Sequence, residues 1–102
     1  MKNRIAHLMS TPKRRKKVQK LQIFAVYDKK ALAYNNPFYY HQKGQAIRGF
    51  EDAINDAQSP FSRHPEDFSL WHIGEFNDTT GVITPLPNPV HVEEALNVLK
   101  TK

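Results

Sequence analysis

Hydrophobic residues recur along this chain with two different periods, and each period predicts a different kind of element. Residues 21–27 form a mostly apolar run rich in β-forming residues, which predicts a strand buried on both faces. Residues 44–57 have apolar positions at helical spacing, which predicts an amphipathic helix with a polar outer side. The apolar positions of this helix are Ala46, Ile47, Phe50, Ala53, Ile54 and Ala57.

Two further strands are predicted between residues 68 and 85. Residues 68–76 form the first of them, and they place two sets of side chains on opposite sides: Phe68, Leu70, His72 and Phe76 on one, Trp71 and Ile73 on the other. Residues 77–81 have the composition of a hairpin connection, in which Gly81 suits a positive φ. Residues 82–85 are the predicted return strand, which Pro85 ends or places at a sheet edge.

Two stretches show a weaker pattern. Residues 31–42 combine a turn signal at Asn35-Asn36-Pro37 with an aromatic cluster that has no clean period, which predicts a loop or a short extended segment. Pro87 and Pro89 then predict a break in the chain. After that break a closing helix is predicted from an i, i+3, i+4, i+7 stripe of Val92, Ala95, Leu96 and Leu99.

The predicted order of elements is β-α-β-β-α, which indicates an α+β sandwich. A right-handed crossover through the long helix sets the first two strands parallel. The expected architecture is therefore a mixed three-stranded sheet with two helices on one face. The other face of the sheet is left thinly covered, and a second copy or a nucleic-acid strand would cover it.

Composition and charge divide the 102 residues into a basic arm and a single domain. The net charge is +5, but residues 1–20 hold eight Lys and Arg and no acid, whereas residues 21–102 hold seven bases and ten acids. We therefore expect a disordered basic arm at 1–20 and one α+β domain at 21–102 that is mildly acidic. Nucleic acid would have to meet the arm or a local patch.

The absence of cysteine and of a long apolar run narrows the class of protein. Without cysteine there are no disulfides and no thiolate metal sites. No run approaches the ~20 apolar residues that a membrane span needs. We expect a soluble intracellular protein that does not cross a membrane.

The titratable residues offer little support for catalysis. His64 and His72 lack the spacing of a zinc site, and Glu66, Asp67 and Glu75 have no nucleophile or phosphate loop that would complete a nuclease. We expect no enzymatic activity, no metal and no cofactor.

Binding of single-stranded DNA fits the residues better, because it needs cations along the backbone and aromatic faces for the bases. The candidate cations of the arm and the candidate aromatic residues are Lys13, Arg14, Arg15, Lys16, Lys17, Lys20, Tyr39 and Tyr40. Arg48 and Arg63 are candidate cations of the domain. Phe38 and Trp71 are expected mainly in the core.

A set of short motifs also resembles a known family across residues 23–81. The motifs are Phe24-Ala-Val-Tyr-Asp28, Pro37-Phe38, Lys43-Gly44, Ala46-Ile47-Arg48 with Phe50, Asn55-Asp56, Ser59, His64-Pro-Glu-Asp67, Ile73-Gly74-Glu75 and Asp78-Thr-Thr-Gly81. They are similar to the small nonstructural protein of gokushovirus-type microviruses, which are phages with circular single-stranded DNA genomes. The resemblance implies a DNA-binding protein linked to single-strand synthesis or packaging. The basic arm departs from the family pattern.

Two functional hypotheses follow. The first is a non-enzymatic single-stranded-DNA-binding phage protein that acts in genome single-strand synthesis or packaging, in the host cell cytoplasm, as a homodimer or higher homo-oligomer. The alternative is a protein-interaction module, an assembly factor or host-directed regulator, that uses the open sheet face without binding nucleic acid.

Overall fold

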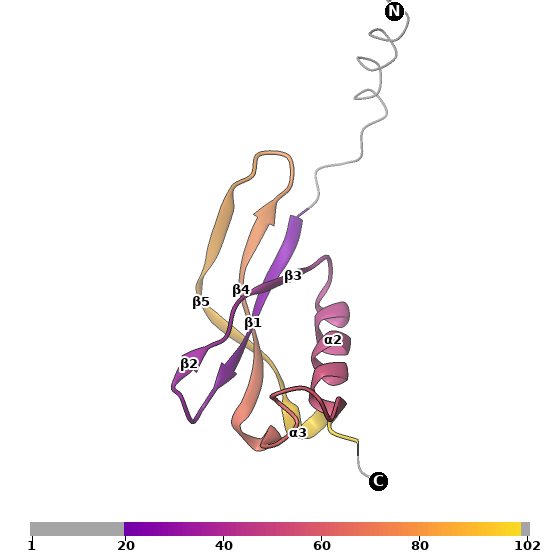
Figure 1. Ribbon diagram of the computed structural model, residues 1–102. Helices are drawn as coiled ribbons and strands as arrows, with labels where there is room; N and C mark the ends of the chain where they lie inside the picture. The colour runs from indigo at the N-terminus through magenta and orange to yellow at the C-terminus, as the bar shows by residue number, and fades with distance from the viewer. Residues whose placement is uncertain (1–19, 101–102) are drawn as a thin grey trace, which may run out of the picture.

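A computed structural model describes residues 20–100 of the chain (Figure 1). Its elements are β1 (Lys20–Asp28), β2 (Ala33–Tyr34), β3 (Phe38–Tyr40), α2 (Lys43–Asn55), the 3-10 turn η2 (Pro65–Asp67), β4 (Phe68–Asn77), β5 (Ile83–Glu94) and α3 (Ala95–Val98). The predicted disordered arm lies outside the described residues, except for Lys20. Within 20–100 no helix is long and apolar enough to cross a membrane.

The described strands form one sheet in which every pairing is antiparallel. β1 is central: it pairs with β4 along one side and with both β2 and β3 along the other. β5 pairs with β4 at the far edge of the sheet. The α+β class is confirmed, but the sheet has five strands instead of three and is not mixed.

The expected parallel pairing of the first two long strands is wrong because the chain reverses once more than the pattern indicates. After β1 the segment with β2 and β3 runs back along the edge of β1. α2 then reverses direction again, and β4 enters the sheet from the end at which β1 finishes (Figure 1). β4 is therefore antiparallel to β1.

The core lies between the sheet and the two helices. Phe24, Phe50, Ile54 and Leu70 are fully buried, and they form one cluster with Val26, Ala46 and Ala95. Four consecutive residues of β1, from Ile23 to Val26, are buried, which confirms the strand covered on both faces. The amphipathic helix is also confirmed, with Ala46, Phe50 and Ile54 turned inward.

α2 and α3 cover the same face of the sheet, as expected, and one side chain joins them. The Asn55 amide Nδ2 donates to the Val98 carbonyl oxygen at 2.9 Å, and Asn55 Oδ1 accepts from the Lys100 backbone N–H at 2.7 Å. Asn55 Nδ2 also donates to the Glu51 carbonyl oxygen within α2. The C-terminal segment is thus fastened to the end of α2.

The region predicted as a break and a closing helix is mostly strand. β5 continues through Pro85, Pro87 and Pro89 to Glu94, and α3 has only four residues. This is possible because β5 is an edge strand, where a missing backbone N–H costs little. Residues 86–89 have no partner in β4, since the register passes from Pro85 opposite Gly74 to Val90 opposite His72.

A β-bulge in β4 overturns one predicted side-chain placement. The pairing with β1 passes from Gly74 opposite Ile23 to His72 opposite Phe24, so Ile73 is the extra residue. A shift of one residue moves every following side chain to the other face. Phe76 therefore lies on the same face as Trp71, and not with Leu70 and His72.

The hairpin connection follows the prediction. Gly81 has φ 78°, and its N–H donates to the Asn77 carbonyl oxygen at 2.8 Å. Asn77 Oδ1 accepts from the backbone N–H groups of Thr79 and Thr80 at 2.9 and 3.2 Å. This local network closes the tip of the β4–β5 hairpin.

Candidate nucleic-acid interface

The sheet face that points away from the helices carries most of the accessible aromatic side chains. We call it the open face. Leu21, Ile23, Ala25 and Tyr27 alternate onto it from β1, because Phe24 and Val26 enter the helical core. The register adds Tyr39 opposite Ile23, Trp71 opposite Ala25 and Phe76 opposite Leu21.

One half of the open face is an aromatic cluster around Trp71. The centre of the Tyr34 ring lies 4.7 Å from that of Tyr27 and 6.3 Å from that of Trp71, with the Tyr34 and Trp71 planes nearly perpendicular. The ring centres of Trp71 and His91 are 5.2 Å apart. Trp71 Nε1 donates to Ser69 Oγ at 2.8 Å, which fixes the indole. Tyr34 remains 43% exposed. A base can stack on an accessible aromatic ring of this kind.

Charge at this end of the open face is locally neutralised. Glu94 Oε1 accepts from Lys29 Nζ at 3.3 Å, and Glu94 Oε2 lies 2.6 Å from His91 Nε2. Both carboxylate oxygens are thus engaged by a nitrogen. A phosphate nearby meets less repulsion from Glu94 than from a free carboxylate.

The other half of the open face contains an apolar hollow of about 330 Å³, lined by Leu21, Tyr39, Phe76 and Ile83. The Tyr39 ring packs edge-on against Phe76, with centres 6.2 Å apart and planes at 77°. Tyr39 is 45% exposed and Ile83 56%. Two of the four residues that line the hollow are therefore accessible to a ligand.

The structure separates the two tyrosines that the sequence groups together. Tyr39 lies on the open face, whereas Tyr40 points the other way and packs with Phe38 against the core. A Cβ at Gly49 of α2 would overlap the Tyr40 hydroxyl, which shows how closely that ring approaches the helix. Tyr39 is therefore available for stacking and Tyr40 serves packing.

The candidate cations that lie within the described residues do not gather around Tyr39. Lys20 begins β1 and forms an ion pair of 3.7 Å with Glu75. Arg48 is exposed on α2, and Arg63 lies in the loop after α2, in a groove shared with Lys100. Neither arginine is on the open face. Lys13, Arg14, Arg15, Lys16 and Lys17 lie outside the described residues.

Sequence reasoning missed Tyr27, Tyr34 and His91 as members of the open face. The alternation of β1 places Tyr27 on the face opposite Phe24 and Val26, so that signal was present. Tyr34 had no usable signal, because β2 has only two residues and its pairing with β1 decides the direction of the ring. His91 joins the face through the unexpected extension of β5.

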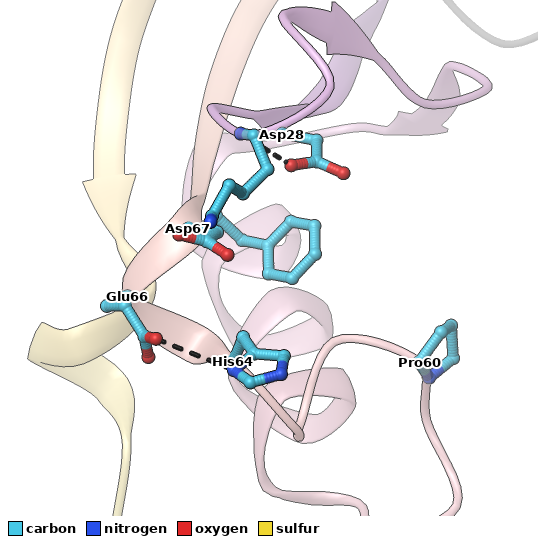
Figure 2. A pocket seen from close by; sticks show the side chains of 7 residues that line it. Asp28, Pro60, His64, Glu66 and Asp67 are labelled. Atoms are coloured by element: carbon cyan, nitrogen blue, oxygen red, sulfur yellow. Dashed lines mark hydrogen bonds and ion pairs between the residues drawn. The ribbon is translucent and has the colours of Figure 1, made fainter.

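A second hollow lies at the opposite end of β4, around η2, and several carboxylate side chains line it (Figure 2). Asp28, Glu66 and Asp67 line it, and His64 Nδ1 lies 3.6 Å from Glu66 Oε2. Asp28 Oδ1 accepts from the backbone N–H groups of Lys30 and Ala31 and so closes the turn after β1.

The carboxylate set considered for a nuclease is not assembled. Glu66 and Asp67 precede β4, whereas Glu75 lies near its far end, beside Lys20. Among residues 20–100 no three His, Asp or Glu side chains are grouped so that they could hold a metal ion. Asp28 at the acidic hollow therefore closes a turn, and the carboxylates there are not arranged in a recognisable catalytic set.

Comparison with known proteins gives one finding. The model of a family described as Phage ORF5 protein matches residues 21–98, which is more than three quarters of the chain and includes the elements from β1, without its first residue, to α3. No curated protein and no solved structure matches.

Proposed function

Because the chain belongs to the Phage ORF5 protein family, and is thus a phage protein, we propose that it binds single-stranded DNA without catalysing a reaction. It acts in the synthesis or packaging of the single-stranded genome, in the host cytoplasm, as the resemblance to microvirus nonstructural proteins implies.

The observation that supports this proposal is the open face itself. It presents aromatic rings in two groups, around Trp71 and around Tyr39, and its carboxylate Glu94 is engaged by Lys29 and His91. Stacking on aromatic side chains contributes about 1–3 kcal/mol per base and tolerates any sequence. The face is therefore suited to bases that are not paired.

The chain also supplies cations next to this face. Lys17 is four residues before Leu21, which lines the hollow, and four residues of chain span at most about 14 Å. The run Lys13 to Lys17 contains five consecutive bases. Phosphates can thus meet the basic run while bases of the same strand meet the open face.

The homodimer expected from the sequence would compete for this face. The nine residues of β1 extend about 30 Å and four strands in a row span about 15–20 Å, which gives a flat area of roughly 500 Å². A stable interface buries about 800 Å² on each partner. A dimer through the open face would therefore have to use nearly all of it, and it would exclude a DNA strand from the same surface.

The test uses Trp71, the only tryptophan of the chain, as a reporter on the open face. Titration with a short single-stranded oligonucleotide should change its fluorescence, and duplex DNA of the same sequence should bind more weakly. Tyr34→Ala removes one stacking ring and should lower affinity about 5- to 100-fold.

The matched control is Leu96→Ala, which removes an apolar side chain that is 56% exposed, against 43% for Tyr34, from α3 on the helical layer. Its affinity should equal that of the wild type. Equal binding by the Tyr34 variant and the wild type would refute the role of the open face. Absence of any oligonucleotide binding at low salt would favour the protein-interaction module instead.

A further inference from the structure

We propose that the hollow lined by Leu21, Tyr39, Phe76 and Ile83 is a base-binding subsite that favours thymine over the other pyrimidines. This inference rests on the proposed binding of single-stranded DNA and adds a preference that general stacking does not supply.

The first argument is that the sheet around the hollow is apolar on one face and charged on the other. β1, β4 and β5 extend here beyond the N-terminal end of α2 (Figure 1). On the side opposite the hollow this part of the sheet carries Lys20 and Glu75 as an ion pair. A sheet region exposed to water on both faces gains nothing from an apolar side. The apolar side is therefore covered when the protein works.

The second argument is the size and shape of the hollow. Its volume of about 330 Å³ is at the lower end of the range for small-ligand sites. The Tyr39 and Phe76 rings meet at 77° and are not stacked face to face, and Tyr39 is 45% exposed, so its ring is accessible to a second planar ring. A single base fits this space, whereas a protein partner needs a much larger area.

The third argument concerns charge, and it favours DNA over a second copy. The hollow includes Leu21, directly after Lys20, and the eight Lys and Arg of residues 1–20 have no acid among them. Two copies that met at their hollows would bring two such segments of like charge together. A nucleotide in the hollow instead brings its phosphate toward them.

The fourth argument gives the preference for thymine. Leu21, Phe76 and Ile83 have no polar side-chain atom, and Tyr39 offers one hydroxyl, so the hydrogen-bonding edges of the bases are hardly distinguished. Thymine differs from uracil by its C5-methyl group alone, and cytosine also lacks this group, so hydrocarbon contact with the methyl favours thymine over both. Burial of one methyl is worth about fourfold in affinity.

The experiment compares oligonucleotides of deoxythymidine and deoxyuridine of equal length, since these differ by the methyl group alone. The full-length wild type should bind the thymidine strand about fourfold more tightly. Ile83→Ser should reduce this ratio to about one. Thr84→Ser is the matched control, because Thr84 follows Ile83 in β5 and lies opposite Glu75, on the other face; it should keep the ratio.

Each outcome decides the inference. A ratio that depends on Ile83 and not on Thr84 supports it. Equal affinity of the wild type for both strands overturns the subsite and leaves DNA binding intact. A wild-type dimer in sedimentation that Ile83→Ser dissociates, with both strands affected equally, overturns it in favour of a second copy. Failure of both strands to bind overturns the subsite together with the proposed function.

Discussion

At the scale of single residues, the contact between Tyr40 and Gly49 shows how closely α2 approaches the edge of the sheet. Gly49 lies inside the helix, where glycine costs about 1 kcal/mol relative to alanine. The structure explains its presence, because a Cβ at this position would overlap the Tyr40 hydroxyl. The ring is held between the helix and Phe38, with which it makes an edge-on contact.

Gly49→Ala is therefore expected to destabilise the protein in spite of the better helix propensity of alanine. Overpacking of a well-filled site costs about 1–3 kcal/mol, and alanine regains about 1 kcal/mol of helix propensity, so we expect a net loss of up to about 2 kcal/mol in the free energy of unfolding, measured in urea. In a Tyr40→Phe background, which lacks the hydroxyl, the same change should cost less. An increase in stability in the wild-type background would show that Tyr40 moves aside freely.

One residue also explains why half of the candidate site escaped the sequence. The pattern of residues 68–76 places Phe76 on the same side as Leu70 and His72, and the bulge at Ile73 moves it to the open face beside Tyr39. Strict alternation contains no signal for an inserted residue. Tyr39 was identified as a candidate from composition, but its partners Leu21, Phe76 and Ile83 depend on a register that only tertiary pairing sets.

At the scale of elements, the docking of the C-terminal segment depends on Asn55. Its amide makes two hydrogen bonds across to the segment that ends the described chain, to the Val98 carbonyl and from the Lys100 N–H. α3 has only four residues and cannot be stable by itself. The segment is therefore held by Ala95 in the core and by this amide.

Asn55→Ala is expected to leave two backbone groups without their partner. The half-buried position suggests a cost of about 1–3 kcal/mol, together with faster amide hydrogen exchange in residues 95–100. The control is Asn97→Ala, since Asn97 is exposed and its Nδ2 donates to the Glu93 side chain and not to a backbone group of the segment. Unchanged exchange in the Asn55 variant would contradict this account of how α3 is held.

The elements differ in how far their sequence determines them. β1 and α2 were predicted within one or two residues at their ends, because their apolar period and their burial agree. β5 was largely missed, since Pro85, Pro87 and Pro89 normally interrupt a strand. They are tolerated here because an edge strand has one unpaired side. The residues of β5 alone do not indicate that this strand lies at the edge of the sheet.

At the scale of the whole molecule, topology and charge were predictable to different degrees. The α+β class and the helices on one face follow from the order of elements. The antiparallel arrangement does not, because β2 and β3 are too short to be recognised and they add the reversal that turns β4 around. Charge is counted from the sequence alone, so the excess of Lys and Arg before residue 21 does not depend on the fold.

This division of charge leads to a prediction that separates local attraction from net charge. If the five bases of Lys13 to Lys17 neutralise phosphates, the affinity for single-stranded DNA should fall roughly a hundredfold between 50 and 200 mM salt. Replacing these five residues by glutamine lowers the net charge from +5 to zero. Binding should then become weak and almost independent of salt, measured by fluorescence anisotropy.

The matched control removes the same amount of charge from the domain. Replacing Lys30, Lys43, Arg48, Arg63 and Lys100 by glutamine also brings the net charge to zero. Arg48 and Arg63 lie on α2 and in the loop after it, away from the open face. This variant should therefore retain most of the salt dependence of the wild type. Equal losses in the two variants would mean that DNA responds to overall charge, and that the basic run has no special position beside the open face.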